Sequence, residues 1–211
     1  MYPFHSVFHS HQQTRHRLVL RRVPGFSLPR GSCVKLYSMS PEVQQSAVNL
    51  LVRPGEMADK VAYDLMPLGY RFATGVAHLV GHQFQYISDP HPGRLPDYWC
   101  SPARTRYRGG GDCDDLSILT VSWLLNDHCT NAWLVTGLVL TEEGWGGHAW
   151  VEGLDQWGRF HIEATSGAFH HGRRPLGYLA RLLLFPGRGY VEVPLPRWQP
   201  AARSFTPSFL S

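Results

Sequence analysis

Long apolar runs, closely spaced cysteines and a signal sequence are missing from this chain, and each absence excludes a class of protein. No stretch of the 211 residues approaches the ~20 consecutive apolar residues of a membrane helix, so we expect no membrane partner. His and Arg interrupt the N-terminal stretch throughout, so we expect no signal peptide. With 43% hydrophobic and 17% charged residues, the composition is that of a globular protein rather than a disordered one.

Cysteine is scarce, and its spacing argues against two functions. Cys33, Cys100, Cys113 and Cys129 include no CxxC pair, which excludes a zinc knuckle and a dithiol redox motif. A chain of this length needs no disulfide scaffold, so we expect reduced thiols and a cytoplasmic location. No calcium loop of the D-x-[DN]-x-[DN]-G type occurs either, so we expect no metal and no other cofactor.

Acidic residues are absent before Glu42, although six basic residues precede it. The rest of the chain has 14 basic and 16 acidic residues, so the formal charge of +4 comes from the N-terminal arm. We interpret residues 1–38 as a solvated basic extension and residues 39–211 as one domain. Binding of nucleic acid through this arm is a weaker alternative. Four arginines would carry it: Arg15, Arg17, Arg21 and Arg22.

Hydrophobic periodicity and turn residues predict helices first and then antiparallel strands, which indicates an α+β fold. Ser40 is the expected N-cap of the first helix, with Pro41 at its first position. The "PHPGRLPDYWCSPARTRYRGGG" segment predicts a long functional loop. The remaining expected elements are a helix running into an extended segment over 76–89, a helix over 113–127, strands over 131–141, 146–154 and 159–165, a helix over 175–185 and a strand over 188–196.

The stretch "RGGGDCDDLSILTVSWLL" places a cysteine between aspartates immediately after three glycines. It is compatible with a metal site, a buried structural thiol or a nucleophile. If Asp112 caps the helix, Cys113 lies in the first turn, where free N–H groups and the helix dipole favour a thiolate. The backbone N–H of Cys113 can then stabilise an oxyanion. Asp112 and Asp115 are expected to support the helix start indirectly.

A cysteine nucleophile needs a base and a group that orients the base. Strand alternation places His148 of "GGHAWVEGL" and Glu163 of "RFHIEAT" on one face of a predicted hairpin. A two-residue loop at Asp155–Gln156 makes the two residues direct opposites, and a four-residue "DQWG" loop makes them diagonal neighbours. Either register supports a Cys–His–acid arrangement of Cys113, His148 and Glu163.

These three motifs, "GGGDCDDLSILTVSWLL", "GHAWVE" and "FHIEATSG", resemble the transglutaminase-like cysteine hydrolase superfamily over about residues 60–170. The upstream "YISDP" and "PDYWCSP" are similar to microbial members, which are peptidases. The resemblance implies helices packed on an antiparallel sheet, a papain-like core, and a nucleophilic cysteine at a helix N-terminus. It assigns catalysis to Cys113, His148 and Glu163, with Glu where the family usually has Asp.

The sequence therefore predicts a thiol-dependent amide hydrolase or acyl transferase that acts on a peptide or protein amide through a thioester. Trp99, Gln83 and Gln85 are candidates for the second oxyanion donor or for substrate contacts, and the sequence does not choose among them. A non-catalytic peptide-binding protein on the same scaffold is the main alternative. Each motif residue alone could be structural: a buried thiol, a strand histidine or a surface carboxylate.

Overall fold

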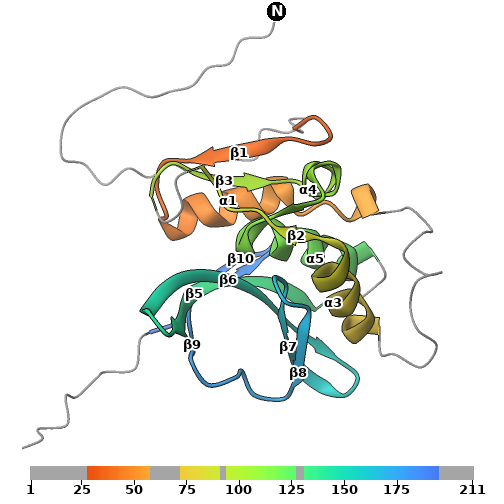
Figure 1. Cartoon of the computed structure of the whole chain (residues 1–211), viewed down its shortest axis with the longest axis vertical. Helices are drawn as coiled ribbons and strands as arrows, with labels where there is room; N and C mark the ends of the chain where they lie inside the picture. Colours follow the sequence, from red (N-terminus) through yellow and green to blue (C-terminus); the bar gives the residue numbers. More distant parts are fainter. Residues whose placement is uncertain (1–27, 58–71, 91–93, 127–130, 195–211) are drawn as a thin grey trace, which may run out of the picture.

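The protein is described by a computed structural model covering residues 28–57, 72–90, 94–126 and 131–194. A strongly curved sheet occupies the lower half of Figure 1, helices cover it, and a two-stranded pair lies above them. Among the described residues, no helix is long and apolar enough to span a bilayer. The α+β class predicted from the sequence is confirmed.

The N-terminal half of the described chain contains the helices and four short strands, which form two pairs. Ser40 caps α1 as predicted, since its hydroxyl accepts from the Val43 N–H, and Pro41 opens the helix. The elements in order are β1 (Cys33–Leu36), α1 (Pro41–Leu51), the 3₁₀ turn η1 (Pro54–Met57), α3 (Phe72–Gln83), β2 (Gln85–Tyr86), β3 (Asp97–Cys100), α4 (Pro102–Arg108), β4 (Gly110–Gly111) and α5 (Cys113–Asn126).

The C-terminal half forms a six-stranded antiparallel sheet with the order β10-β9-β5-β6-β7-β8. Its strands are β5 (Ala132–Thr141), β6 (Gly144–Asp155), β7 (Gly158–Glu163), β8 (Ala168–His171), β9 (Tyr178–Phe185) and β10 (Gly189–Glu192). Two smaller sheets pair β1 with β3 and β2 with β4. The predicted strands over 131–141, 146–154, 159–165 and 188–196 correspond to β5, β6, β7 and β10.

Helix α5 packs between the other helices and the sheet, which explains why its sequence is apolar on nearly every side. Every residue from Asp114 to Leu124 is buried. Alternate side chains of β5, β6 and β7, such as Leu134, Val151 and Ile162, meet this helix in the main core. The opposite face of the same strands holds a second cluster around Trp133, Val135 and Trp150. The sheet is thus buried on both faces, and the predicted site lies where α5 meets it.

Two predicted elements are wrong. The segment over 175–185 is strand β9 rather than a helix, because its apolar residues face both sides of the sheet: Leu182 and Leu184 join the main core, and Ala180 joins the second cluster. A strand buried on both faces gives a continuous apolar run that periodicity cannot tell from a buried helix. The predicted long loop before Gly109 contains β3 and α4.

Strand β1 lies inside the predicted 1–38 extension, yet it pairs with β3 and buries Leu36 in the main core. The described part of the domain therefore starts before residue 39. Residues 1–27, including the four arginines proposed for nucleic acid, lie outside the described residues.

Helix α3 approaches the turn between β7 and β8 unusually closely. A Cβ added at Gly81 would lie 2.3 Å from the Gly167 backbone nitrogen, so only glycine fits there. Gly167 itself has φ +74°, a left-handed conformation that favours glycine. Its N–H donates to the Glu163 carbonyl oxygen at 2.8 Å. Two glycines therefore fix the turn that follows Glu163.

Candidate active site

Cys113 opens α5, and the glycines before it allow close backbone packing. The Leu116 N–H donates to the Asp112 carbonyl at 3.0 Å, which makes Asp112 the residue that precedes the helix. A Cβ on Gly110 would lie 2.0 Å from the Gln85 carbonyl oxygen. A Cβ on Gly111 would lie 2.4 Å from the Asp115 Cβ. The glycine run is thus required where β4 meets β2 and α5, and it delivers the thiol to the sheet.

His148 and Glu163 meet as the sequence predicted. The His148 Nε2 lies 2.7 Å from a Glu163 carboxylate oxygen. The turn is formed by Gln156 and Trp157, and Val151 pairs with Ile162. This register is the one expected for the four-residue loop, so His148 and Glu163 are diagonal neighbours. Because Glu163 takes Nε2, the imidazole has Nδ1 left for a proton transfer.

Four hydrogen bonds hold the Glu163 carboxylate. One oxygen accepts from the Thr165 N–H (3.1 Å) and hydroxyl (2.7 Å), and the other accepts from His148 and from the Tyr178 hydroxyl (2.9 Å). Burial alone would raise the pKa of Glu163, but the bonds from His148 and Thr165 outweigh it and hold the pKa at about 2. Glu163 is therefore an ionised, fixed partner for the imidazole. The sequence reasoning missed Tyr178 because the 175–185 segment was interpreted as a helix.

A cleft of about 740 Å³ contains both predicted reacting groups. Cys113 and His148 line it together with Gly147 and Ala149. Its outer walls include three exposed apolar side chains: Met39, Tyr86 and Leu95. A cleft of this volume with a few polar groups and apolar walls suits a peptide segment.

The thiol of Cys113 is not the thiolate that the helix position predicts. Burial raises the pKa of Cys113 to about 12, and the neighbouring Asp112 carboxylate raises it further, while the Ala149 N–H acts in the opposite direction as a donor. The helix dipole is thus outweighed by desolvation and by negative charge. The thiol is protonated at neutral pH, so nucleophilic attack requires a base.

Carboxylates gather beside the thiol. Oxygens of Asp89, Asp97 and Asp112 lie within 4.8 Å of one another, and so do those of Asp112, Asp114 and Asp115. Burial raises the pKa of Asp112 to about 6 and that of Asp115 to about 8, and it raises the pKa of Asp114 well above its usual value.

One oxygen each of Asp112 and Asp114 is buried without a hydrogen-bond partner in the described part of the chain. Such a donor set fits a hard cation such as Ca²⁺. Asp89, Asp97 and Asp112 lie in separate segments of the sequence, so a search for a contiguous calcium loop could not find them.

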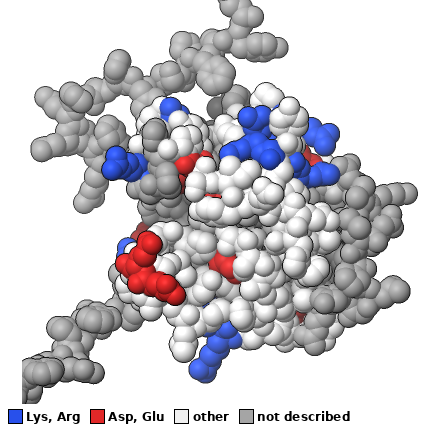
Figure 2. All heavy atoms as spheres, in the orientation of Figure 1, with Lys and Arg blue, Asp and Glu red and all other residues white. Residues whose placement is uncertain are grey.

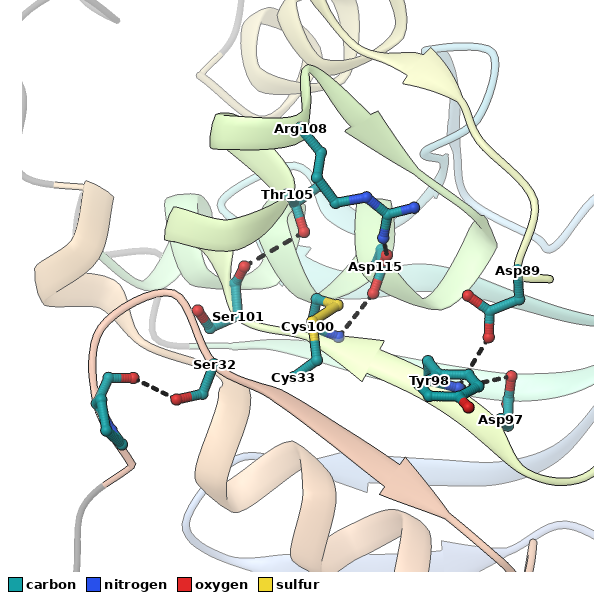
Figure 3. Close-up of a disulfide and its surroundings, with 11 residues drawn as sticks. Ser32, Cys33, Asp89, Asp97, Tyr98, Cys100, Ser101, Thr105, Arg108 and Asp115 are labelled. Atoms are coloured by element: carbon teal, nitrogen blue, oxygen red, sulfur yellow. Dashed lines mark hydrogen bonds and ion pairs between the residues drawn. A yellow bond between two sulfur atoms is a disulfide. The ribbon is translucent and has the colours of Figure 1, made fainter.

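Asp115, in the first turn of α5, contacts residues of β3 and α4, as Figure 3 shows. One oxygen accepts from the Cys100 N–H at 2.7 Å, and the other lies 3.5 Å from the Arg108 guanidinium. The same close-up shows a disulfide between Cys33 and Cys100, which are directly paired residues of β1 and β3.

The prediction that these two cysteines are reduced is therefore wrong, because tertiary pairing of distant strands brings them together. Disulfides persist mainly in oxidising compartments, so the cytoplasmic location loses the argument that supported it. Cys113 is the free cysteine of the described residues, and Cys129 lies outside them.

The predicted oxyanion donors are poorly placed for that role. Trp99 lines the cleft, but its indole N–H donates to Asp97 at 2.9 Å. Gln83 and Gln85 are exposed and absent from the cleft walls. Tyr86 lines the cleft instead. Burial raises the pKa of its phenol, and the electrostatic effect of Cys113 raises this pKa further. Parallel pairing of Tyr86 with Gly111 brings it near the thiol, which local sequence cannot reveal.

A second polar layer lies on the His148 face of the sheet. Glu152 is fully buried, accepts from the Trp150 indole at 3.0 Å and from Arg174 at 2.5 Å, and contacts Arg159. Trp150 stacks beside His148 with ring centroids 6.3 Å apart. This layer therefore adjoins the imidazole on the same face of the sheet.

Charge on the visible surface does not form a single basic patch. Figure 2 shows basic side chains gathered near α4 and acidic side chains gathered near the β5–β6 end of the sheet. The face in that view carries both signs and shows no extended basic surface of the kind that nucleic acid needs.

No protein-family model matches the chain, and no curated protein matches it. Among solved structures, EGTA-treated LapG from Legionella pneumophila is 18% identical with a TM-score of 0.46, over 58% of this chain and 66% of LapG. The calcium-bound LapG is 16% identical with a TM-score of 0.46, over 74% of this chain and 81% of that one. The chain thus spans just under two thirds of the first of these structures. A likeness of this strength carries no activity over to this chain.

Proposed function

We propose that the protein is a thiol-dependent hydrolase of peptide or protein amide bonds. The observation that carries the proposal is the 2.7 Å His148–Glu163 contact at the wall of the cleft that Cys113 also lines. A protonated thiol, an imidazole with one free nitrogen and a fixed carboxylate form the set of groups that acyl transfer through a thioester requires.

In the proposed reaction, His148 Nδ1 accepts the proton of the Cys113 thiol as the sulfur attacks the amide carbonyl. The Cys113 backbone N–H and the Tyr86 hydroxyl stabilise the oxyanion. His148 then protonates the leaving amine, the C–N bond breaks and a thioester remains. Water attacks the thioester with His148 as base, which releases the acid and restores the thiol. An amine in place of water would give acyl transfer instead. Glu163 stabilises the imidazolium in each step.

A non-catalytic peptide-binding protein is the second candidate. The raised pKa of Cys113, about 12, favours it, because a thiol without an effective base does not react at neutral pH. The hydrolase predicts a Cys113 thiol that reacts at neutral pH, and the peptide-binding protein predicts an unreactive one.

The test is labelling of Cys113 by a blocked trialanyl chloromethyl ketone at pH 7, compared with Cys113→Ala and His148→Ala. The hydrolase predicts stoichiometric labelling of the wild type, none of Cys113→Ala, and a rate at least ~100-fold lower for His148→Ala, within the range of general-base effects. Labelling that is absent from the wild type, or equally fast without His148, contradicts the hydrolase.

A further inference from the structure

Strand β6 is paired along most of its length on one edge and along less than half of it on the other. It pairs with β5 from Gly144 to Gly153. It pairs with β7 only from Val151 to Asp155. Residues 144–150 therefore present an edge with no strand partner among the described residues. This edge leads into the cleft, because Gly147, His148 and Ala149 line it.

The hydrogen-bonding pattern identifies which backbone groups point off this edge. The Leu154 N–H donates to the Asn131 carbonyl on the β5 side at 2.8 Å. Since N–H and C=O groups of successive strand residues alternate in direction, His148 and the other even-numbered residues of β6 face β5. Ala149 and Gly147 therefore face the unpaired edge. Ala149 and Cys113 line the same cleft, so the edge leads to the proposed nucleophile.

Gly147 is the next outward-facing residue along the edge, and space surrounds it. No atom lies within 4 Å of a Cβ added at Gly147, nor at Gly146 or Gly144. Gly147 is exposed, and no hydrogen bond within the described parts of the chain occupies its N–H or carbonyl. An approaching backbone therefore meets unpaired donor and acceptor groups without a side chain in the way.

We propose that the β6 edge at Gly147 binds the substrate as an added β-strand. An extended peptide would pair its main chain with the Gly147 N–H and carbonyl and present its scissile carbonyl at Cys113. This mode of recognition selects flexible, extended segments over helices and folded domains, because main-chain groups supply the affinity. Side chains of the added strand that point to the apolar wall would contact Tyr86 and Leu95. The proposal rests on the proposed hydrolase function and specifies its substrate class.

The test compares two substitutions at one position. Gly147→Ala keeps the N–H and adds a methyl group that meets no atom, whereas Gly147→Pro removes the N–H. Each variant is treated with the trialanyl chloromethyl ketone, whose labelling requires peptide binding, and with iodoacetamide, which needs none. Gly147→Ala is the reference for Gly147→Pro, because both variants lose the glycine and only the alanine variant keeps the N–H. Gly147→Pro should react normally with iodoacetamide and roughly five- to tenfold more slowly with the peptide, as expected for one lost hydrogen bond.

A second measurement covers the case in which Gly147→Pro does not fold. Wild-type protein is treated with peptides N-methylated at one amide each. Strand pairing predicts that only alternate methyl groups slow labelling, since alternate amides face the edge. Equal effects at all positions, or equal peptide rates for the proline and alanine variants, overturn the added strand. Failure of the hydrolase itself gives a different result, namely no dependence of labelling on His148.

Discussion

Replacing Glu163 by glutamine should reduce stability in a way that depends strongly on pH. The substitution keeps the size of the side chain and removes the charge that His148 and Thr165 stabilise. The pKa of Glu163 is about 2 in the folded protein, against a usual 4.5. At 1.36 kcal/mol per pKa unit, the charged form contributes about 3 kcal/mol to the free energy of unfolding.

The direction of the pH dependence follows from the lowered pKa of Glu163. The contribution is fully present above the usual value of 4.5 and disappears as the pH falls toward about 2, where the folded wild type is also protonated. Glu163→Gln should therefore cost about 3 kcal/mol at pH 7 and only about 1 kcal/mol at pH 3. Urea unfolding of both proteins at the two pH values measures the difference.

Glu143→Gln is the control, because Glu143 lies in the exposed turn between β5 and β6 and should leave the stability unchanged. A cost for Glu163→Gln that is the same at pH 7 and pH 3, or smaller than about 1 kcal/mol at pH 7, would refute the account of Glu163 as a stabilised carboxylate.

Three further predictions concern the surroundings of the site. Asp112→Asn removes a negative charge that raises the pKa of Cys113. Alkylation by iodoacetamide at pH 8 should then accelerate about tenfold, because a pKa lower by about one unit gives about ten times more thiolate. An unchanged rate would exclude the charge effect. Tyr178→Phe deletes one donor to Glu163 and should cost about 1 kcal/mol in urea unfolding, with slower peptide labelling; wild-type behaviour in both assays contradicts a positioning role. Cys33→Ser removes the disulfide that links residues 67 positions apart and should lower the free energy of unfolding by up to about 4 kcal/mol. Reductant added to the wild type should abolish this difference between the two proteins, and a difference that reductant does not change would contradict the disulfide.

The sequence was most informative where local chemistry decides the structure. The cap at Ser40, the glycines before Cys113 and the alternation around His148 each express a rule that operates over a few residues. Glu163 was found because a hairpin with a short turn restricts its partner to two registers, and one of these is observed. The main elements of the candidate triad were therefore accessible without coordinates.

The remaining features depend on contacts between distant segments. The Cys33–Cys100 link requires the pairing of β1 with β3, and Tyr178 reaches Glu163 only because β9 inserts beside β5. The high pKa of Cys113 arises from burial and from carboxylates of several elements, which the position at a helix start does not reveal. Periodicity and local motifs carry no information on such contacts.

The contact of Gly81 with Gly167 has a consequence for anyone who scans this protein by mutation. A side chain at Gly81 would push on the turn that follows Glu163, and that turn holds Thr165 against the carboxylate. In an activity screen, substitutions at Gly81 would be grouped with those of the triad, although the residue has no functional group and contributes nothing to the cleft walls. Comparing labelling rates with thermal stability for such variants would separate a displaced carboxylate from a lost nucleophile. Loss-of-function maps of this fold should thus contain false catalytic positions on α3.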